Sequence, residues 1–422
     1  MSEFNLQQAL AKVQAASRKF VMTEEKVITQ VMTKLAGLLE KNVAKILIEN
    51  EKDLAKMDKN DAMYDRVLLN EKRILAMAES VREIAKYDSP VGIELEHKVL
   101  ENGLDLRKVS VPFGVVGCVF EARPNVVIDI FALCFKSRNA CVMKGGSQSG
   151  NSNGVLAEII SEAIKVAGEE NSFMSDLVLL LKNDRELLAE FMKQDKYVDV
   201  LIPRGGQGLI KFVRENSMIP VIETGAGVVH TYFDEEGDLE KGREIVFNAK
   251  VSRPSVCNAL DTLIIHNSRL KDLQRIVRTM EEKKVEIFAD GEAYKILEGD
   301  YPKDLLHKAS EENFGMEYLS LKMAVKTVNS LDEALEHIAN FGSKHSESII
   351  TENRESAEKF LKAVDAACVY VNASTRFTDG GEFGLGAEVG ISTQKLHARG
   401  PMGIKELTSY KWIARGNGQV RK

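Results

Sequence analysis

The sequence predicts an α/β protein built from two doubly wound sheets of mostly parallel strands. Short apolar runs alternate with amphipathic stretches from about residue 110 to residue 371, and such alternation favours parallel sheets covered by helices. Glycine-rich turns follow several of these runs, where parallel sheets bind their ligands. A chain of 422 residues also exceeds one ordinary core, so two or three domains are expected.

Composition narrows the class of protein. A net charge of −6 with 28% charged residues disfavours non-specific binding to nucleic acid or anionic membranes. The five cysteines form no Cys-x-x-Cys pair, and no apolar run approaches a membrane helix or a secretory signal. We therefore expect a cytoplasmic protein with reduced thiols. No histidine spacing suits a metal, so none is expected.

The N-terminal 90 residues predict helices, and a hairpin follows them. Apolar residues recur at every fourth position and so form one helix face: Val27, Val31, Leu35 and Leu39. Asn102-Gly103 then separates Val99-Leu100 from Leu104-Asp105-Leu106. Asn-Gly between apolar runs is a strong signal of a tight hairpin, here within residues 97–111.

Strands and helices alternate after the hairpin, on both sides of a break near residue 229. The strands predicted before the break are Val111–Phe120, Ala140–Lys144, Leu177–Leu181, Val198–Ile202 and Pro220–Glu223. The helices between them are Val126–Lys136, Asn153–Val166 and Gln207–Glu215. The later strands are Ala259–His266, Met323–Val328, Glu347–Thr351 and Ala367–Val371, with helices Leu270–Lys283, Leu331–Asn340 and Arg354–Val364.

Two turns of the first sheet are suited to phosphate. In Lys144-Gly145-Gly146-Ser147, glycines let the backbone approach a phosphate that the lysine can pair with. Arg204-Gly205-Gly206-Gln207-Gly208 opens a helix, whose amides and dipole favour an anion. Neither turn has a dinucleotide or Walker spacing, and each is compatible with an ordinary strand-to-helix connection.

Cys257 is the candidate nucleophile among the cysteines. It follows the turn-forming sequence Arg253-Pro254-Ser255-Val256, so its thiol is expected at an element boundary and partly exposed. The others lie inside predicted strands or helices, where buried structural thiols are expected: Cys118, Cys134, Cys141 and Cys368. Position alone leaves a structural role open for Cys257 as well.

Long motifs surround these features. They are Phe120–Val126, Met143–Ser147, Ile202–Gly206, Arg253–Asn258, Val371–Gly381 and Ser392–Gly403. Together they resemble the aldehyde dehydrogenase superfamily and, within it, the gamma-glutamyl phosphate reductase family, over essentially the whole chain. The resemblance implies an NADPH-binding domain over residues 1–229, a catalytic domain over 230–385, and a C-terminal loop, return segment and oligomerisation strand over 386–422. It makes the hairpin an oligomerisation arm that pairs with a strand near Trp412.

The resemblance also implies an activity. The family reduces L-glutamyl 5-phosphate with NADPH to L-glutamate 5-semialdehyde and releases phosphate, the second step of L-proline biosynthesis from glutamate. A homo-oligomer, dimer or tetramer, and a contact with glutamate 5-kinase are further expectations. The alternatives are a non-phosphorylating NAD(P)-dependent aldehyde dehydrogenase and a non-catalytic NADP-binding scaffold.

The resemblance assigns roles to individual residues. Cys257 is the nucleophile, and Asn125 stabilises the oxyanion together with the Cys257 amide. The cofactor residues are Lys144, Gly146, Ser147, Gly205, Gly206 and Glu317. Arginines suited to the anionic groups of the substrate are Arg123, Arg253, Arg376 and Arg399, with Asp379 or Glu382 for the ammonium group.

Three of these positions carry a further argument. Ser147 stands where NAD-preferring relatives have a glutamate, so a 2′-phosphate meets no repulsion and NADPH is favoured. Glu223 matches the glutamate that activates water in hydrolytic relatives, but a structural strand-end carboxylate is an equal alternative. Glu317 is preferred over Glu312 for the ribose, because only that register aligns the following strand without gaps.

Overall fold

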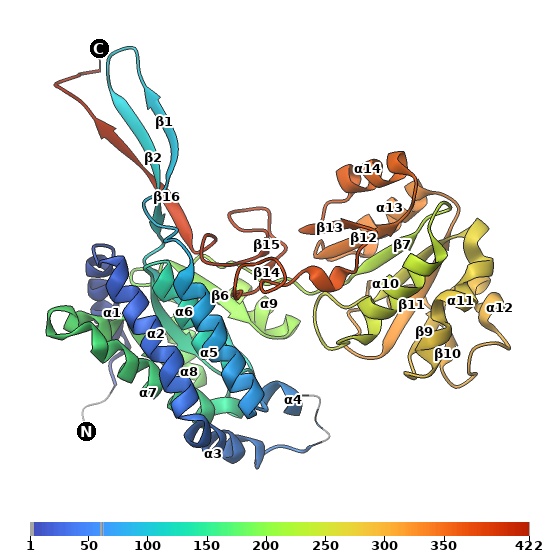
Figure 1. The fold of residues 1–422 in the computed structure, drawn as a ribbon, viewed down its shortest axis with the longest axis horizontal. Coiled ribbons are helices and arrows are strands. Elements are labelled where there is room, and N and C mark those ends of the chain that lie inside the picture. The colour runs from blue at the N-terminus through green and yellow to red at the C-terminus, as the bar shows by residue number, and fades with distance from the viewer. Residues whose placement is uncertain (1–3, 60, 62, 422) are drawn as a thin grey trace. The chain divides into compact units, whose positions relative to one another are not determined.

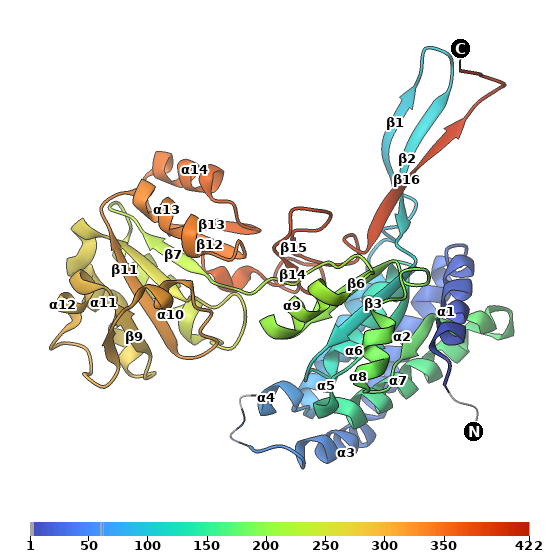
Figure 2. The ribbon, with the colours of Figure 1, turned by 180° about the vertical axis from the view of Figure 1, so that it is seen from behind.

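The chain forms two compact units (Figures 1 and 2). The computed structural model describes residues 4–59, 61 and 63–421. Unit 1 comprises residues 1–224, 384–390 and 402–422, and unit 2 comprises residues 225–383 and 391–401. The division thus falls after Thr224, and the C-terminal segment 386–422 contributes to both units.

Unit 1 begins with helices that pack on its sheet. Their bounds are α1 Leu6–Phe20, α2 Glu25–Lys41, α3 Val43–Leu54, α4 Tyr64–Val67 and α5 Glu71–Lys86. The apolar stripe of α2 buries Val31, Leu35 and Leu39, as the four-residue period predicts. The predicted Val27 is only partly buried, and its neighbour Ile28 is buried instead. This stripe contacts α5 and α7.

The sheet of unit 1 is parallel, with strand order β5-β4-β3-β6. Its elements are β3 Val115–Phe120, α6 Asn125–Lys136, β4 Ala140–Lys144, α7 Gly150–Ile164, β5 Val178–Leu180, α8 Arg185–Phe191, β6 Val200–Arg204 and α9 Gln207–Asn216. The single strand predicted over Val111–Phe120 is wrong, because Phe113 and Gly114 separate β2 from β3 and Gly114 has a φ of 123°. The strand predicted at Pro220–Glu223 is also wrong, since only Val221 forms a bridge, to Leu201.

An antiparallel arm projects from unit 1 (Figure 1). Its strands are β1 Glu94–Val99, β2 Asp105–Pro112 and β16 Thr408–Arg415, in the order β1-β2-β16. Asn102-Gly103 lies in the turn between β1 and β2, as predicted. Trp412 pairs with Lys108 across β16 and β2, which agrees with the C-terminal pairing that the resemblance implied.

Unit 2 contains a longer parallel sheet with strand order β10-β9-β11-β8-β7-β12-β13. Its strands are β7 His230–Phe233, β8 Thr262–His266, β9 Glu286–Ala289, β10 Leu306–Lys308, β11 Lys322–Val328, β12 Ser346–Ile350 and β13 Cys368–Val371. Its helices are α10 Leu239–Val251, α11 Leu270–Glu281, α12 Gly291–Leu297, α13 Leu331–Phe341 and α14 Arg354–Ala363. The short strands β14 Ile391–Ser392 and β15 Gly400–Pro401 pair with each other.

The core of unit 2 lies on both faces of this sheet. Leu263 and Ile265 of β8 belong to one buried apolar cluster, and Ile264 between them belongs to another. Side chains of a strand alternate between faces, so a continuous apolar run indicates a strand covered on both sides. The doubly wound arrangement predicted from the sequence follows from such runs.

Candidate active site

The predicted cofactor residues of unit 1 gather at one edge of its sheet. Strand β3 lies between β4 and β6, with Val119 paired to Lys144 and Phe120 to Arg204. The turns after these three strands therefore leave the sheet at the same edge, before α6, α7 and α9. Parallel α/β sheets bind ligands at this edge.

The glycine turns at this edge are closely packed. A Cβ at Gly205 would meet the side chains of Glu121 and Leu209, so any larger residue there would displace one of them. The neighbouring Gly206 N–H donates a hydrogen bond of 3.0 Å to Glu121 Oε2, one residue before α9 begins. The amide that the sequence predicted to bind phosphate thus donates to a carboxylate of the same chain.

Lys144 and Ser147 lie on either side of the turn that follows β4. Lys144 is buried at the end of β4, and its ammonium donates to Asn183 Oδ1 at 2.8 Å. Burial lowers the pKa of Lys144, and the carboxylates of Asp184 and Glu121 oppose this effect. Ser147 is exposed and uncharged. A cation beside a neutral hydroxyl accepts a 2′-phosphate without like-charge repulsion.

Asn125 is the first residue of helix α6, and its side chain is bound by a residue one helical turn later. Its Nδ2 donates to Asp129 Oδ2 at 2.8 Å. Burial raises the pKa of Asp129 to about 6, while Asn125, Arg204 and Arg123 act in the opposite direction. Residue 122 before this helix has a φ of 47°, an unusual value for alanine and typical of functional turns.

Glu223 forms an ion pair within unit 1. Its Oε2 lies 3.3 Å from Arg214 Nη1 of helix α9. The carboxylate is therefore engaged by a guanidinium, which favours the structural alternative over water activation.

In unit 2, Cys257 lies in a loop between α10 and β8, which we call the nucleophile loop (residues 253–257). All five cysteines carry free thiols, and Cys257 is the one that is partly exposed while the other four are buried. A side chain at Gly227 would overlap the carbonyl of Cys257. The backbone of residue 227 therefore fixes the position of the nucleophile, and only glycine allows the contact.

Glu317 is placed beside the same loop. Its Oε1 accepts a hydrogen bond of 2.8 Å from the Gly227 N–H, and Gly227 contacts Cys257. Glu312 instead lies in a short 3-10 helix, Glu311–Gly315. This geometry supports Glu317 as the carboxylate near the nucleophile.

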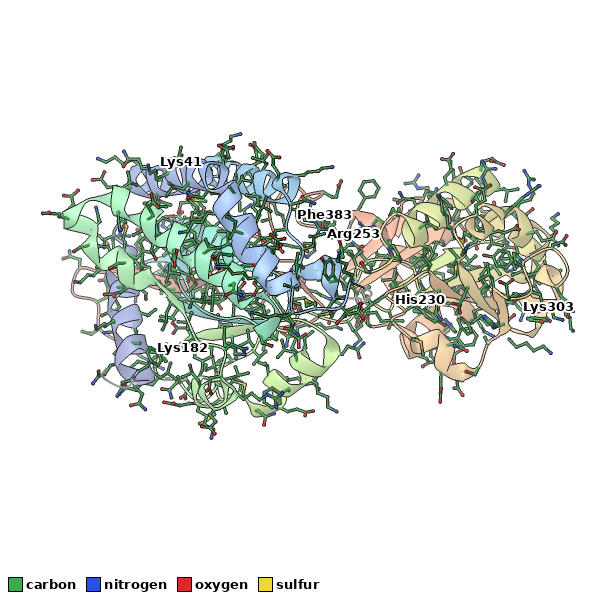
Figure 3. The ribbon with its side chains drawn as sticks, turned by 90° about the horizontal axis from the view of Figure 1, so that it is seen from below. Lys41, Lys182, His230, Arg253, Lys303 and Phe383 are labelled. Carbon is green, nitrogen blue, oxygen red and sulfur yellow. The ribbon has the colours of Figure 1, made fainter. Side chains whose placement is uncertain are left out.

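Two of the predicted substrate arginines accompany Cys257. Burial lowers the pKa of Arg376, Arg253 lowers it further, and Asp379, Cys257 and Glu382 raise it. These charged groups are thus close enough to interact. Figure 3 marks Arg253, which follows α10.

Arg399 lies in a different cluster of charges. Its Nη2 forms an ion pair of 2.8 Å with Asp365, which also pairs with Lys395 and Lys344. Lys395 and Arg399 lower the pKa of Asp365 to about 2.

The sequence analysis did not identify three side chains that bind the predicted site residues. Asp129 could have been found, because it lies four residues after Asn125 in a predicted helix. Glu121 contacts Gly206 only once β3 and β6 are paired. Asn258 accepts a hydrogen bond from Arg376, a residue too distant in sequence to give a local signal.

Within the described part of the chain, no helix is long and apolar enough to span a membrane. Over the same residues, no group of three or more His, Cys, Asp or Glu side chains is placed to hold a metal ion.

Comparisons with known proteins agree on one family. A gamma-glutamyl phosphate reductase from Pelodictyon phaeoclathratiforme is 54% identical over 412 residues, 98% of each chain. The crystal structure of a gamma-glutamyl phosphate reductase from Thermotoga maritima matches with a TM-score of 0.92 and 39% identity, over 99% of this chain and 100% of that one. An engineered glycolyl-CoA reductase with bound NADP⁺ matches in fold, with a TM-score of 0.68 and 14% identity over 96% of each chain. No family model matches.

Proposed function

The chain belongs to the gamma-glutamyl phosphate reductase family, and we propose that it reduces L-glutamyl 5-phosphate to L-glutamate 5-semialdehyde through a thioester on Cys257. The reaction releases phosphate and is the second step of L-proline biosynthesis from glutamate. The main support for a thioester is the nucleophile loop. Its thiol is partly exposed, its backbone is in close contact with Gly227, and Arg253 and Arg376 lie near it.

The first step uses the thiolate of Cys257. Its sulfur forms a bond to the acyl carbon, the carbonyl oxygen becomes an oxyanion, and the carbon–oxygen bond to phosphate then breaks. Phosphate leaves with the bonding electron pair, so no acid is needed to protonate it. The product of this step is a thioester on the enzyme.

The oxyanion needs hydrogen-bond donors. The backbone N–H of Cys257 is one proposed donor, and the amide of Asn125 is the other. Asp129 holds one N–H of that amide, which fixes the amide plane and leaves the second N–H to donate. A preorganised donor costs no reorganisation when charge develops.

The residues proposed to hold the cofactor are Lys144, Gly146, Ser147, Gly205, Gly206 and Glu317. The crowded glycine turns and the buried lysine ammonium described above support this set. A nicotinamide cofactor held by these residues would supply hydride to the thioester of Cys257, and the resulting thiohemiacetal would release the aldehyde and the free thiol. Lys144 beside neutral Ser147 supports a preference for NADPH.

The substrate carries a phosphate, a carboxylate and an ammonium group. Arg123, Arg253 and Arg376 are proposed for the anionic groups because guanidinium matches both phosphate and carboxylate. Asp379 and Glu382, which interact with Arg376, are proposed for the ammonium. Arg399 remains the weakest candidate, since Asp365 already pairs with it.

The thioester must not be hydrolysed before it is reduced. Glu223 is the residue that could activate water, and its ion pair with Arg214 lowers its availability as a base. Hydrolysis of the thioester is therefore disfavoured, in contrast to a non-phosphorylating dehydrogenase.

Assembly and compartment are also proposed. The arm exposes apolar side chains, among them Leu95, Val99, Tyr410 and Trp412, which a second copy of the chain would cover. We propose a homo-oligomer on this basis. The free thiols support a reducing compartment, the cytoplasm. A contact with glutamate 5-kinase would protect the labile acyl phosphate.

Replacing Cys257 by Ser tests the mechanism. We expect reductase activity to fall at least about 1,000-fold, because a hydroxyl is a far weaker nucleophile at neutral pH. The buried Cys368 provides a matched control, and Cys368→Ser should retain activity. An active Cys257→Ser enzyme would rule out the thioester.

The reverse reaction separates the two dehydrogenase mechanisms. Wild-type enzyme with NADP⁺ and the semialdehyde should reduce NADP⁺ only when phosphate is present. Equal rates in phosphate-free buffer would support the non-phosphorylating alternative.

A further inference from the structure

The guanidinium of Arg376 joins the two ends of the nucleophile loop. Its Nε donates to Ser252 Oγ at 3.1 Å, and its Nη1 donates to Asn258 Oδ1. Ser252 is the residue after helix α10, and Asn258 directly follows Cys257. One planar cation thus contacts the residues on both sides of the loop that carries the nucleophile.

Asn258 holds the segment of Arg376 by several bonds at once. Its side chain is 3% exposed, and its Nδ2 donates to the carbonyl of Thr378 at 2.8 Å. Its own backbone carbonyl accepts a hydrogen bond of 2.9 Å from Thr375 Oγ1. A buried amide is stable only when its donors and acceptors are paired, so Asn258 locks the turn at residues 375–378 onto the nucleophile loop.

Charged groups from the nucleophile loop and from the segment after Arg376 surround the Arg376 guanidinium. The nucleophile loop contributes Arg253 and Cys257, and the segment after Arg376 contributes Asp379 and Glu382. Arg376 contacts Ser252 and Asn258 on both sides of the loop, so its guanidinium is held close to Cys257, and a nearby cation favours a thiolate. Arg376 is partly buried, so solvent screens this attraction less than at a free surface.

We propose that Asn258 is a positioning residue that holds the Arg376 guanidinium across the nucleophile loop, and that this guanidinium favours the thiolate form of Cys257. The inference rests on the proposed function, because it takes Cys257 as the nucleophile. It gives Arg376 a role toward the enzyme's own thiol, in addition to the substrate role proposed above.

The rate at which iodoacetamide alkylates Cys257 tests the proposal without substrate or cofactor. The full chain is treated across pH 5 to 10, and modification of the peptide that contains Cys257 is measured by mass spectrometry. Only the thiolate reacts, so the pH midpoint of the rate reports thiolate formation. In Asn258→Ala we expect the midpoint to rise by about one pH unit, with about tenfold slower alkylation below it.

Two further variants separate charge from position. Arg376→Gln removes the guanidinium and should raise the midpoint at least as far as Asn258→Ala. Arg376→Lys keeps the charge but loses the planar fork, so its midpoint should lie between wild type and Arg376→Gln. Arg243→Gln removes an exposed arginine of α10 in the same unit and should leave the midpoint unchanged.

An unchanged midpoint in folded Asn258→Ala refutes the proposal. Far-UV circular dichroism verifies folding, and if that variant does not fold, an unchanged midpoint in Arg376→Gln refutes it equally. The proposed function fails in a different way, through an active Cys257→Ser enzyme. At pH 7, turnover of Asn258→Ala should fall about tenfold while its KM for NADPH stays unchanged.

Discussion

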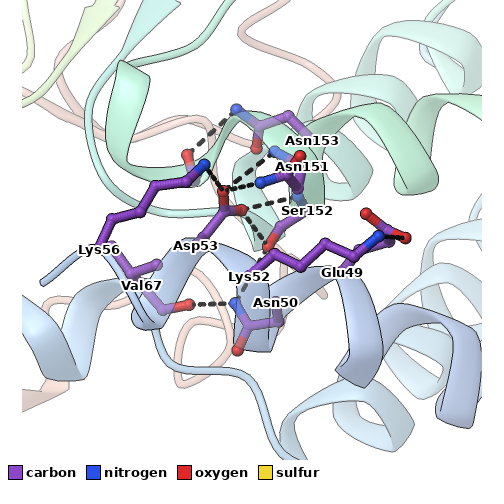
Figure 4. Close-up of polar contacts among 10 residues, drawn as sticks. Glu49, Asn50, Lys52, Asp53, Lys56, Val67, Asn151, Ser152 and Asn153 are labelled. Atoms are coloured by element: carbon purple, nitrogen blue, oxygen red, sulfur yellow. Dashed lines mark hydrogen bonds and ion pairs between the residues drawn. The ribbon is translucent and has the colours of Figure 1, made fainter.

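Asp53 is predicted to be one of the most costly side chains to remove from unit 1. It lies at the end of α3 with 1% exposure, and both of its oxygens cap helix α7 (Figure 4). Oδ1 accepts hydrogen bonds from Asn151 N and Nδ2 at 3.2 and 2.7 Å. Oδ2 accepts from Ser152 N and Oγ, both at 2.8 Å. Helix α7 directly follows the turn that carries Lys144 and the predicted cofactor site.

The expected cost of Asp53→Ala follows from these contacts. Loss of an N-cap costs about 1 kcal/mol, and each buried donor left without a partner costs about 1–3 kcal/mol. Ser152 N–H and Oγ–H are buried, although water entering the vacated space would satisfy one of them. We therefore expect the free energy of unfolding to fall by about 3–4 kcal/mol.

Urea unfolding followed by far-UV circular dichroism measures this loss. Glu49→Ala is the matched control on the same helix, because Glu49 pairs with the exposed Lys52 at 2.6 Å. Such surface pairs contribute less than about 1 kcal/mol. If the free energy of unfolding falls no further in Asp53→Ala than in Glu49→Ala, the hydrogen bonds of Asp53 contribute less than predicted and the argument is refuted.

Three other outcomes are expected. Gly227→Ala should abolish reductase activity, because the added methyl overlaps the Cys257 carbonyl, whereas Gly208→Ala meets nothing within 4 Å and should stay active. Burial and the neighbouring His230 lower the pKa of His337 to about 3. This folded pKa lies below the unfolded value of about 6.5, so the free energy of unfolding falls as the pH falls. Between pH 7 and pH 5, urea unfolding should show that His337→Leu loses about 2 kcal/mol less of this free energy than wild type, and equal losses would contradict the argument. Trp412→Glu in the arm should lower the mass measured by light scattering, and an unchanged mass would exclude the arm from the oligomer interface.

The sequence predicted the elements that carry long apolar runs. Strand β4 and the starts of α9, α11, α13 and α14 match their predicted positions, because turn residues bound each run clearly. The short strands β9 and β10 were not predicted, since four or fewer residues give no periodic signal. Strand β9 pairs with β11, and β10 pairs in turn with β9, so both strands depend on neighbours that their own sequences do not indicate.

The candidate site was predicted unevenly for a similar reason. Cys257 stands out locally, because polar and turn-forming residues precede it. Outside the candidate site, no such signal indicates the buried pair of His230 and Glu347, although the two side chains lie 3.0 Å apart. Figure 3 marks His230. Burial raises the pKa of Glu347, and the contact exists only because β7 and β12 are neighbours.

Glu121 shows what a local motif can and cannot specify. The Arg204–Gly208 turn predicts an anion at the start of α9 because its amides point away from the helix. Nothing in that turn determines which anion binds, and in the structure it is the carboxylate of Glu121. The Gly206 N–H donates one strong hydrogen bond at a time, so a nucleotide phosphate that uses it must replace this carboxylate. The net gain from phosphate binding at this amide is therefore smaller than an empty turn would provide, and more of the proposed affinity would come from Lys144, whose ammonium donates to a neutral partner, Asn183.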